Sequence, residues 1–253
     1  MMKTSPIVLA LLLACFALQA QSINKAFSAT GTIVLTMDNT DLTIEGYSGT
    51  EVQIEAAGYE GPPERAKGLR ALSSRGQDNT GLGLEITTSG GTMEIKKTSG
   101  QSVDYRIKVP QRANLKIEED GWGGSGDYEI RGCQGEIEIL TTNSDMVLEN
   151  VSGPIIAKST SGDITVKYGT LNTEKPTSIV NTSGFIDVSF PSAAKASLKL
   201  RSISGEIYSD LDLKVPDNDF KQKYSSKIDG DLNGGGVEIS LHAISGDIYL
   251  RKQ

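Results

Sequence analysis

Acidic side chains recur at one position of a repeated turn, directly after a small residue. Paired carboxylates can act as acid and base on a glycosidic bond, and such a column could also bind a cation or a sugar. In a turn they can instead accept backbone N–H groups and keep the corner soluble. Pro154 and Phe185 interrupt the series, which favours the turn role, so we predict no catalytic residue. The acids are Asp127, Glu136, Asp145, Asp163, Glu206 and Asp247.

Two tyrosines, Tyr208 and Tyr249, occupy equivalent positions in two copies of this turn and point outward in the predicted strands. Exposed aromatic rings can stack on the C–H faces of sugars. The alternative is that they only pair across a sheet face. The residues that could contact a ligand are therefore Tyr208, Tyr249, Asp163, Glu206 and Asp247.

The single histidine, His242, lies between inward-facing positions and is expected on the surface. No G-x-S-x-G elbow accompanies it, and a Ser-His-Asp triad is not expected. One histidine without a thiolate cluster is a poor zinc site. Once a leader is removed, Cys133 is the only cysteine, and we interpret it as a small filler near a turn. We predict no cofactor and no metal.

The first twenty residues, 1–20, have the features of a signal peptide: Lys3, an apolar run over 7–18, and Ala20 at the cleavage position. An alternative is a lipoprotein in which Cys15 carries the lipid. Both interpretations predict an exported protein that is periplasmic, on the cell surface or secreted. No second apolar stretch follows, so no transmembrane segment is expected in the mature chain.

Composition narrows the class of protein. The 253 residues include 28 glycines, only 6% are aromatic, and the formal net charge is −7. Many glycines and few aromatic residues favour a chain of turns and aliphatic strands. An acidic chain without a basic run is a poor partner for nucleic acid.

The repeat predicts the architecture. Aligned on the turn, the small residues Gly126, Ser144, Gly162, Gly184, Gly205 and Gly246 are spaced 18, 18, 22, 21 and 41 apart. Five residues of alternating apolar and polar character follow each turn, as in strands with one buried face. Stacked copies would share a core. We therefore predict an all-β, single-domain β-solenoid, or parallel β-helix, of about 18–22 residues per coil, with a β-sandwich as the alternative. The turn glycines are expected to have positive φ.

The stacking prediction has specific consequences along the chain. Ile164, Ile186 and Ile248 should lie in register along the core. One domain should span 21–253, with irregular insertions near 59–81 and 212–236. The ends of the stack should be capped by residues 21–36 and by the tail "LRKQ".

Residues 104–253 resemble the bacterial putative-adhesin family of repeat β-solenoid domains. The resemblance rests on "YRIKVPQRANLKIEE", on the run from "GDYEIRGCQGEIEIL" to "TSGDITVKYG", and on "HAISGDIYLRKQ". It implies a repeat architecture and no catalytic signature, and it assigns no site residue.

Together these features predict a non-catalytic, adhesin-like or scaffolding module at the cell envelope, whose partner is a cell-surface protein or glycan. One alternative is a carbohydrate-active β-helix enzyme that uses the turn carboxylates. Another is a structural or regulatory envelope component.

Overall fold

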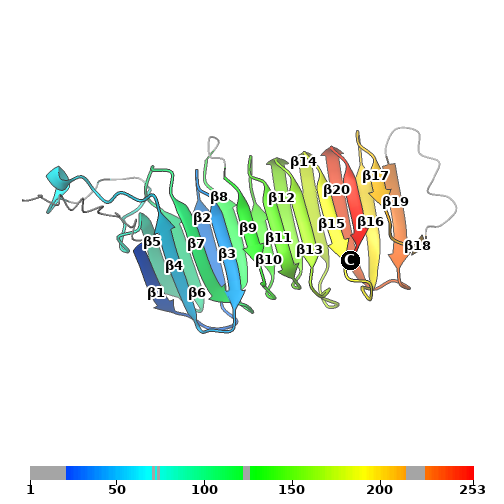
Figure 1. The fold of residues 1–253 in the computed structure, drawn as a ribbon, viewed down its shortest axis with the longest axis horizontal. Coiled ribbons are helices and arrows are strands. Elements are labelled where there is room, and N and C mark those ends of the chain that lie inside the picture. Colours follow the sequence, from blue (N-terminus) through cyan, green and yellow to red (C-terminus); the bar gives the residue numbers. More distant parts are fainter. Residues whose placement is uncertain (1–20, 70–71, 73–74, 122–125, 215–225) are drawn as a thin grey trace, which may run out of the picture.

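Two β-sheets lie face to face and enclose one continuous core of aliphatic and aromatic side chains. The computed structural model describes residues 21–69, 72, 75–121, 126–214 and 226–253. The predicted signal peptide with Cys15 lies outside the described residues. The described strands stack side by side into an elongated rod, with each strand running across the long axis (Figure 1).

The alternating sequence produces these strands directly. In β2 (Thr32–Met37), Ile33, Leu35 and Met37 are buried, and the residues between them are half-buried on the outer face. The interior strands thus present one apolar row to the core and one polar row to water. The other strands of this sheet, sheet B, are β5 (Leu84–Ser89), β6 (Thr92–Lys97), β8 (Asn114–Glu119), β10 (Ile137–Leu140), β12 (Ile155–Ser161), β14 (Thr177–Ser183), β16 (Ala196–Ser202), β18 (Leu213–Lys214), β19 (Ser226–Leu232) and β20 (Val237–Ser245).

The second sheet, sheet A, forms the opposite wall of the rod. Its strands run parallel from β7 to β17, and β1 and β4 join antiparallel at one end. They are β1 (Gln21–Ala26), β3 (Leu42–Tyr47), β4 (Glu51–Ala57), β7 (Asp104–Pro110), β9 (Tyr128–Arg131), β11 (Met146–Val151), β13 (Ile164–Tyr168), β15 (Ile186–Phe190), β17 (Ile207–Ser209) and β21 (Ile248–Lys252).

The predicted solenoid is confirmed. Each coil contributes one strand to sheet B and the next strand to sheet A, as β12 and β13 do. Met146 pairs with Ile164 and Ile164 with Ile186, so one lap takes 18 or 22 residues. Ile186 in turn pairs with Ile248, which places the three predicted isoleucines in one fully buried column.

The order of the coils differs from the order of the sequence. The coil of β20 and β21 inserts between the coil of β14 and β15 and the coil of β16 and β17, as the red strands of Figure 1 show. The coil of β2 and β3 likewise lies between β6–β7 and β8–β9. The prediction that the tail caps the stack is therefore wrong, because β21 is an interior strand. The prediction for 21–36 is only partly right, because β1 ends sheet A whereas β2 is interior. At the ends, sheet A finishes at β1 and β17 and sheet B at β5 and β18.

The recurrent turn glycines are explained mainly by how closely the stacked backbones approach. A Cβ on Gly246 would overlap the carbonyl oxygen of Gly184, and one on Gly205 would overlap that of Gly246. Positive φ, which we expected throughout, occurs only at Gly162 and Gly184 in this series (+116° and +118°). At Gly126, Gly205 and Gly246, glycine is needed because a Cβ would overlap the backbone of the neighbouring coil, whereas the remaining turn carries Ser144.

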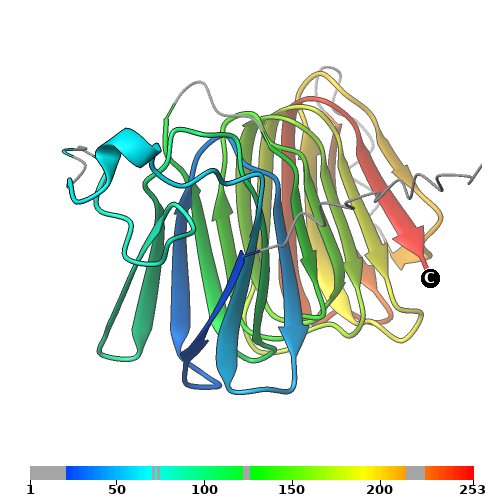
Figure 2. The same ribbon diagram turned by 60° about the vertical axis from the view of Figure 1, so that its left-hand side comes forward.

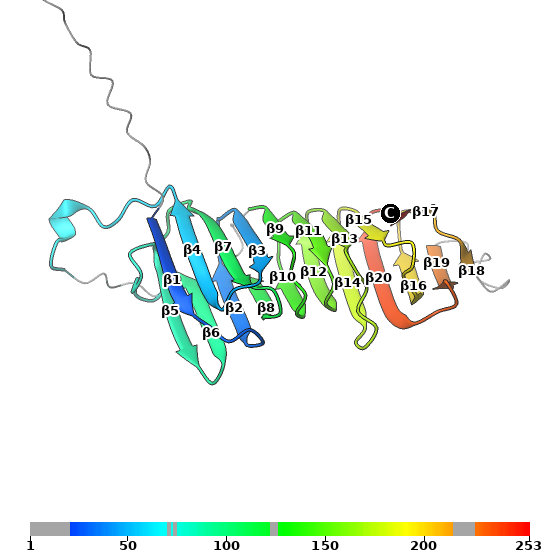
Figure 3. The same ribbon diagram turned by 60° about the horizontal axis from the view of Figure 1, so that its bottom comes forward.

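The irregular segment after β4 projects beyond the end of the rod (Figures 2 and 3). Its described part forms one short 3₁₀ helix, η1 (Glu64–Ala66), which buries no residue. Positions 70–71 and 73–74 lie outside the described residues, as do 215–225 of the second irregular segment. The described residues contain no helix with the length and apolar character that a membrane crossing requires.

The corner packing can be tested with Gly246→Ala. The added methyl group forces apart two backbones, so the free energy of unfolding should fall by about 2 kcal/mol in urea titrations. Gly61→Ala is the matched control, because a Cβ there would meet nothing within 4 Å. Equal stability of the two variants would contradict the packing argument.

Cys133 is fully buried, and burial raises the pKa of its thiol to about 12. The thiol should therefore stay protonated and unreactive at pH 8 in the native protein. Peptide-level mass spectrometry after iodoacetamide treatment should find Cys133 unmodified until guanidinium unfolds the chain. Because the folded state favours the neutral thiol, its contribution to stability should be lost as pH rises from about 9 towards 12. Rapid native alkylation would show that the thiol is accessible.

Candidate functional site

Four of the five predicted ligand-contact residues meet at one end of the outer face of sheet A. Tyr208 on β17 pairs in register with Tyr249 on β21. The outward positions on either side of each tyrosine are polar, so two rows of three side chains lie next to each other. We call this group the terminal platform. It consists of Glu206, Tyr208, Asp210, Asp247, Tyr249 and Arg251.

Aromatic stacking organises the terminal platform. The Tyr208 and Tyr249 rings are nearly parallel at 11°, with centroids 5.4 Å apart, and Phe185 meets the Tyr249 ring edge-on at 6.0 Å. Although it is stacked, Tyr208 remains 52% exposed. Both tyrosines and Arg251 help to line an open hollow of about 250 Å³.

Polar contacts fix the orientation of the Tyr249 ring. Its hydroxyl donates to the Asp247 carboxylate at 2.9 Å, and that bond raises the pKa of Tyr249. Two donors, the backbone N–H of Glu206 and this hydroxyl, hold the pKa of Asp247 below its usual value. Arg251 lies over the Tyr249 ring, 5.6 Å from its centroid, and donates to the Asp187 carboxylate at 2.9 and 3.0 Å. These contacts together fix the orientation of the Tyr249 ring.

Asp163, the fifth predicted residue, lies apart from the terminal platform in a ladder of turn carboxylates. Its Oδ1 accepts the N–H of Phe185 at 3.0 Å, and Asp145 accepts the N–H of Asp163 at 2.7 Å. These two bonds join the coil of Asp145 to that of Asp163, and the coil of Asp163 to that of Phe185. Burial first, and the neighbouring Asp145 and Asp41 second, raise the pKa of Asp127. Within the described ranges, no three His, Cys, Asp or Glu side chains are grouped as a metal site.

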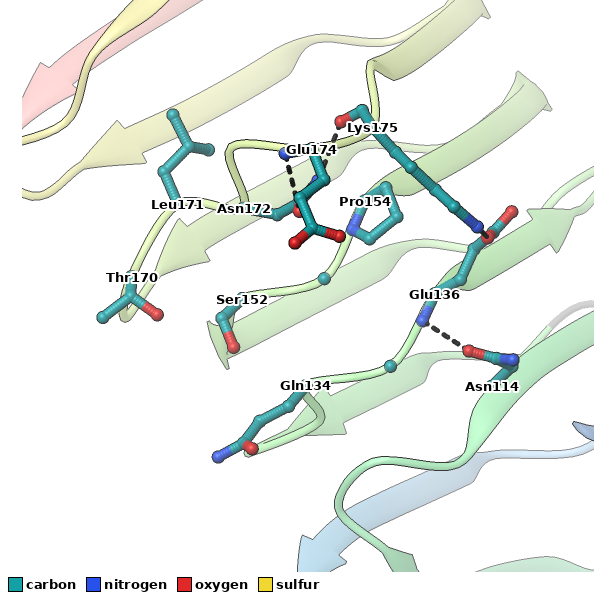
Figure 4. A pocket seen from close by; sticks show the side chains of 12 residues that line it. Asn114, Gln134, Glu136, Ser152, Pro154, Thr170, Leu171, Asn172, Glu174 and Lys175 are labelled. Atoms are coloured by element: carbon teal, nitrogen blue, oxygen red, sulfur yellow. Dashed lines mark hydrogen bonds and ion pairs between the residues drawn. The ribbon is translucent and has the colours of Figure 1, made fainter. Parts of the chain in front are cut away.

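Sequence reasoning missed a polar hollow of about 420 Å³ at the opposite corner of the coils. Its wall is the loop 169–176 between β13 and β14, from which Lys175 reaches past Pro154 to Glu136 at 2.8 Å (Figure 4). The sequence did contain a sign of this loop, because the coil that includes it takes 22 residues whereas the preceding coil takes 18. The hollow is open and lined largely by turn residues, so it offers a ligand little enclosure.

Two further titratable side chains have structural surroundings. His242 lies on the outer face of sheet B, between Val180 and Arg201, as its outward phase predicted. It is half-buried, however, and its Nε2 atom is buried, so it is less exposed than we expected. Lys97 points into the core, where its ammonium donates to the backbone oxygens of Asp38 and Asn39 at 2.6 and 3.0 Å. Burial lowers the pKa of Lys97. Its two hydrogen bonds satisfy backbone oxygens directly after β2.

Substitutions at Asp163 test whether the carboxylate ladder stabilises the fold. Asp163→Ala should lower the free energy of unfolding by about 1 kcal/mol, because the N–H of Phe185 loses its acceptor. Asp163→Asn should be milder, since its amide oxygen can still accept that bond. Asp104→Ala, at an exposed carboxylate, serves as the control in the same urea titrations. An Asp163→Ala variant as stable as the control would remove the ladder's structural role.

Comparison with known proteins gives the family. Residues 18–251 match the family model described as Toastrack DUF4097. No curated protein gives a significant match. Among solved structures, a putative cell adhesion protein from Clostridium sporogenes is 12% identical with a TM-score of 0.46, and the alignment covers 93% of this chain and 100% of that one. A putative adhesin from Bacteroides fragilis is 10% identical with a TM-score of 0.45, covering 93% and 97%.

The family match spans nearly the whole chain and confirms the predicted resemblance to a family of repeat β-solenoid domains. The protein belongs to the Toastrack family (DUF4097).

Proposed function

We propose that this protein is an exported, non-catalytic binding module of the bacterial cell envelope, which acts like an adhesin or a scaffold. The observation that carries the proposal is the exposed Tyr208 ring, which stacks on Tyr249 in the terminal platform at one end of a rod with a continuous core. Exposed, preorganised aromatic side chains are typical of recognition surfaces, because they lose little entropy on binding.

The turn carboxylates support binding over catalysis. A glycosidase needs one carboxyl group with a raised pKa opposite a second that acts as a base or nucleophile. Here Asp145, Asp163 and Asp247 each accept a backbone N–H from the neighbouring coil. Groups that hold the coils together in this way are poorly placed to exchange protons with a substrate.

Export is supported by residues 1–20, whose charge, apolar run and small residue at position 20 are typical of a signal peptide.

The outer face of sheet A is suited to contact with water. Its long side chains form cross-strand ion pairs, among them Lys167 with Glu149 at 2.8 Å and Arg131 with Glu149 at 3.3 Å. Such a charged face leaves the terminal platform as the distinctive surface for a partner.

The proposal predicts that binding depends on the terminal platform. The purified protein should bind members of a glycan array or an array of envelope proteins, and the double change Tyr208→Ala with Tyr249→Ala should weaken that binding at least about tenfold. Tyr47→Ala, in β3 near the other end of sheet A, should leave binding unchanged. Circular dichroism would check that each variant is folded. Binding of the wild type to neither array would contradict the proposed function.

A further inference from the structure

We infer that the terminal platform recognises a glycan through a neutral pyranose ring, which stacks on the outward face of Tyr208. The inference rests on the proposed function, since it names the ligand class and the contact for that same surface.

Three aromatic rings form a row across neighbouring coils, and this row is open at one end. Phe185, Tyr249 and Tyr208 follow one another on neighbouring coils, each in contact with the next. The Tyr249 ring is in contact with Arg251, Phe185 and Tyr208, whereas sheet A ends at β17 among the described residues. The exposed face of Tyr208 therefore offers the next position in the row. A pyranose fits there because its C–H face is complementary to the negative face of an aromatic ring.

The rim of the terminal platform supplies hydrogen-bond partners for sugar hydroxyls. Glu206 and Asp210 are exposed acceptors on either side of Tyr208, and Asp247 lies next to Glu206. The backbone N–H of Lys252 donates to Asp210 at 2.7 Å. A carboxylate can accept several hydrogen bonds, so acceptor positions remain for a ligand. Hydroxyl groups are donors that can use those positions.

The charge of the rim selects against anionic sugars. Three carboxylates, those of Glu206, Asp210 and Asp247, face one guanidinium, that of Arg251. This guanidinium is already paired with Asp187. A uronic or sialic acid would therefore meet net repulsion, and a neutral ring would not.

The short strand β17 disfavours an added peptide strand at the same place. It has three residues, Ile207–Ser209, and such a length provides few free backbone groups for strand addition. A ligand held by ring stacking and side-chain hydrogen bonds needs no such edge.

Saturation-transfer NMR on the purified protein would test the inference with three probes: cellotetraose, tetra-N-acetylchitotetraose and tetragalacturonate. We expect the two neutral probes to bind, with transfer to the ring protons of one pyranose face, and the anionic probe to bind more weakly. Tyr208→Ala should weaken neutral binding about tenfold, because stacking and apolar burial are both lost. Tyr208→Phe should keep it within about twofold, since the ring remains.

Tyr47→Ala is the control for a surface tyrosine of the same sheet, whose hydroxyl donates to the backbone oxygen of Glu51 at 2.9 Å. Preference for tetragalacturonate, or neutral binding that survives Tyr208→Ala, would overturn the inference. The inference would also fail if the wild-type protein bound none of the three probes but bound an envelope protein, and if Tyr208→Ala abolished that binding. In that case the proposed function would still stand. Protein that binds neither sugars nor envelope proteins would overturn both.

Discussion

The structure depends on how closely one lap of backbone can lie on the next. Neighbouring strands in a sheet are about 4.8 Å apart, and at the corners this spacing continues through the turns. Gly205 and Gly246 sit where a Cβ would overlap the carbonyl oxygen of a neighbouring lap. The acid that follows the glycine uses the same closeness, because its carboxylate reaches an N–H of the adjacent coil, as Asp247 reaches Glu206. Glycine and acid thus act as one joint between laps.

Much of the fold could be predicted from sequence because the joint and the alternating strand are local signals. They placed Ile164, Ile186 and Ile248 in one column and gave the length of a lap. The order of the coils could not be predicted in the same way. Every copy offers the same apolar row and the same corner, so any copy can stack on any other. The 41-residue gap between Gly205 and Gly246 marked an irregularity, but only long-range contacts decide that the later copy is the inner one.

Part of the candidate site could be predicted from the sequence for a similar reason. Equivalent positions in two copies become neighbours once the copies stack, which brings Tyr208 beside Tyr249. Asp163 belongs to another coil, and the coil that carries Phe185 separates it from the terminal platform. The inward phase of β6 did contain a signal for the buried Lys97, because Met93 and Ile95 precede it at alternate positions. Nothing local shows, however, that the backbone oxygens of Asp38 and Asn39 lie within reach of its ammonium.

The inserted coil has a consequence for the order in which the protein folds. Tyr208 precedes Tyr249 by 41 residues in the chain, yet the later β21 lies inside β17 in the stack. Among the described strands, β21 is the one neighbour of β17 in sheet A. β17 therefore cannot pair within this sheet until β21 is in place, whereas β16 of the same coil also pairs with β19. Formation of the aromatic pair thus requires that the C-terminal coil has already taken its inner position.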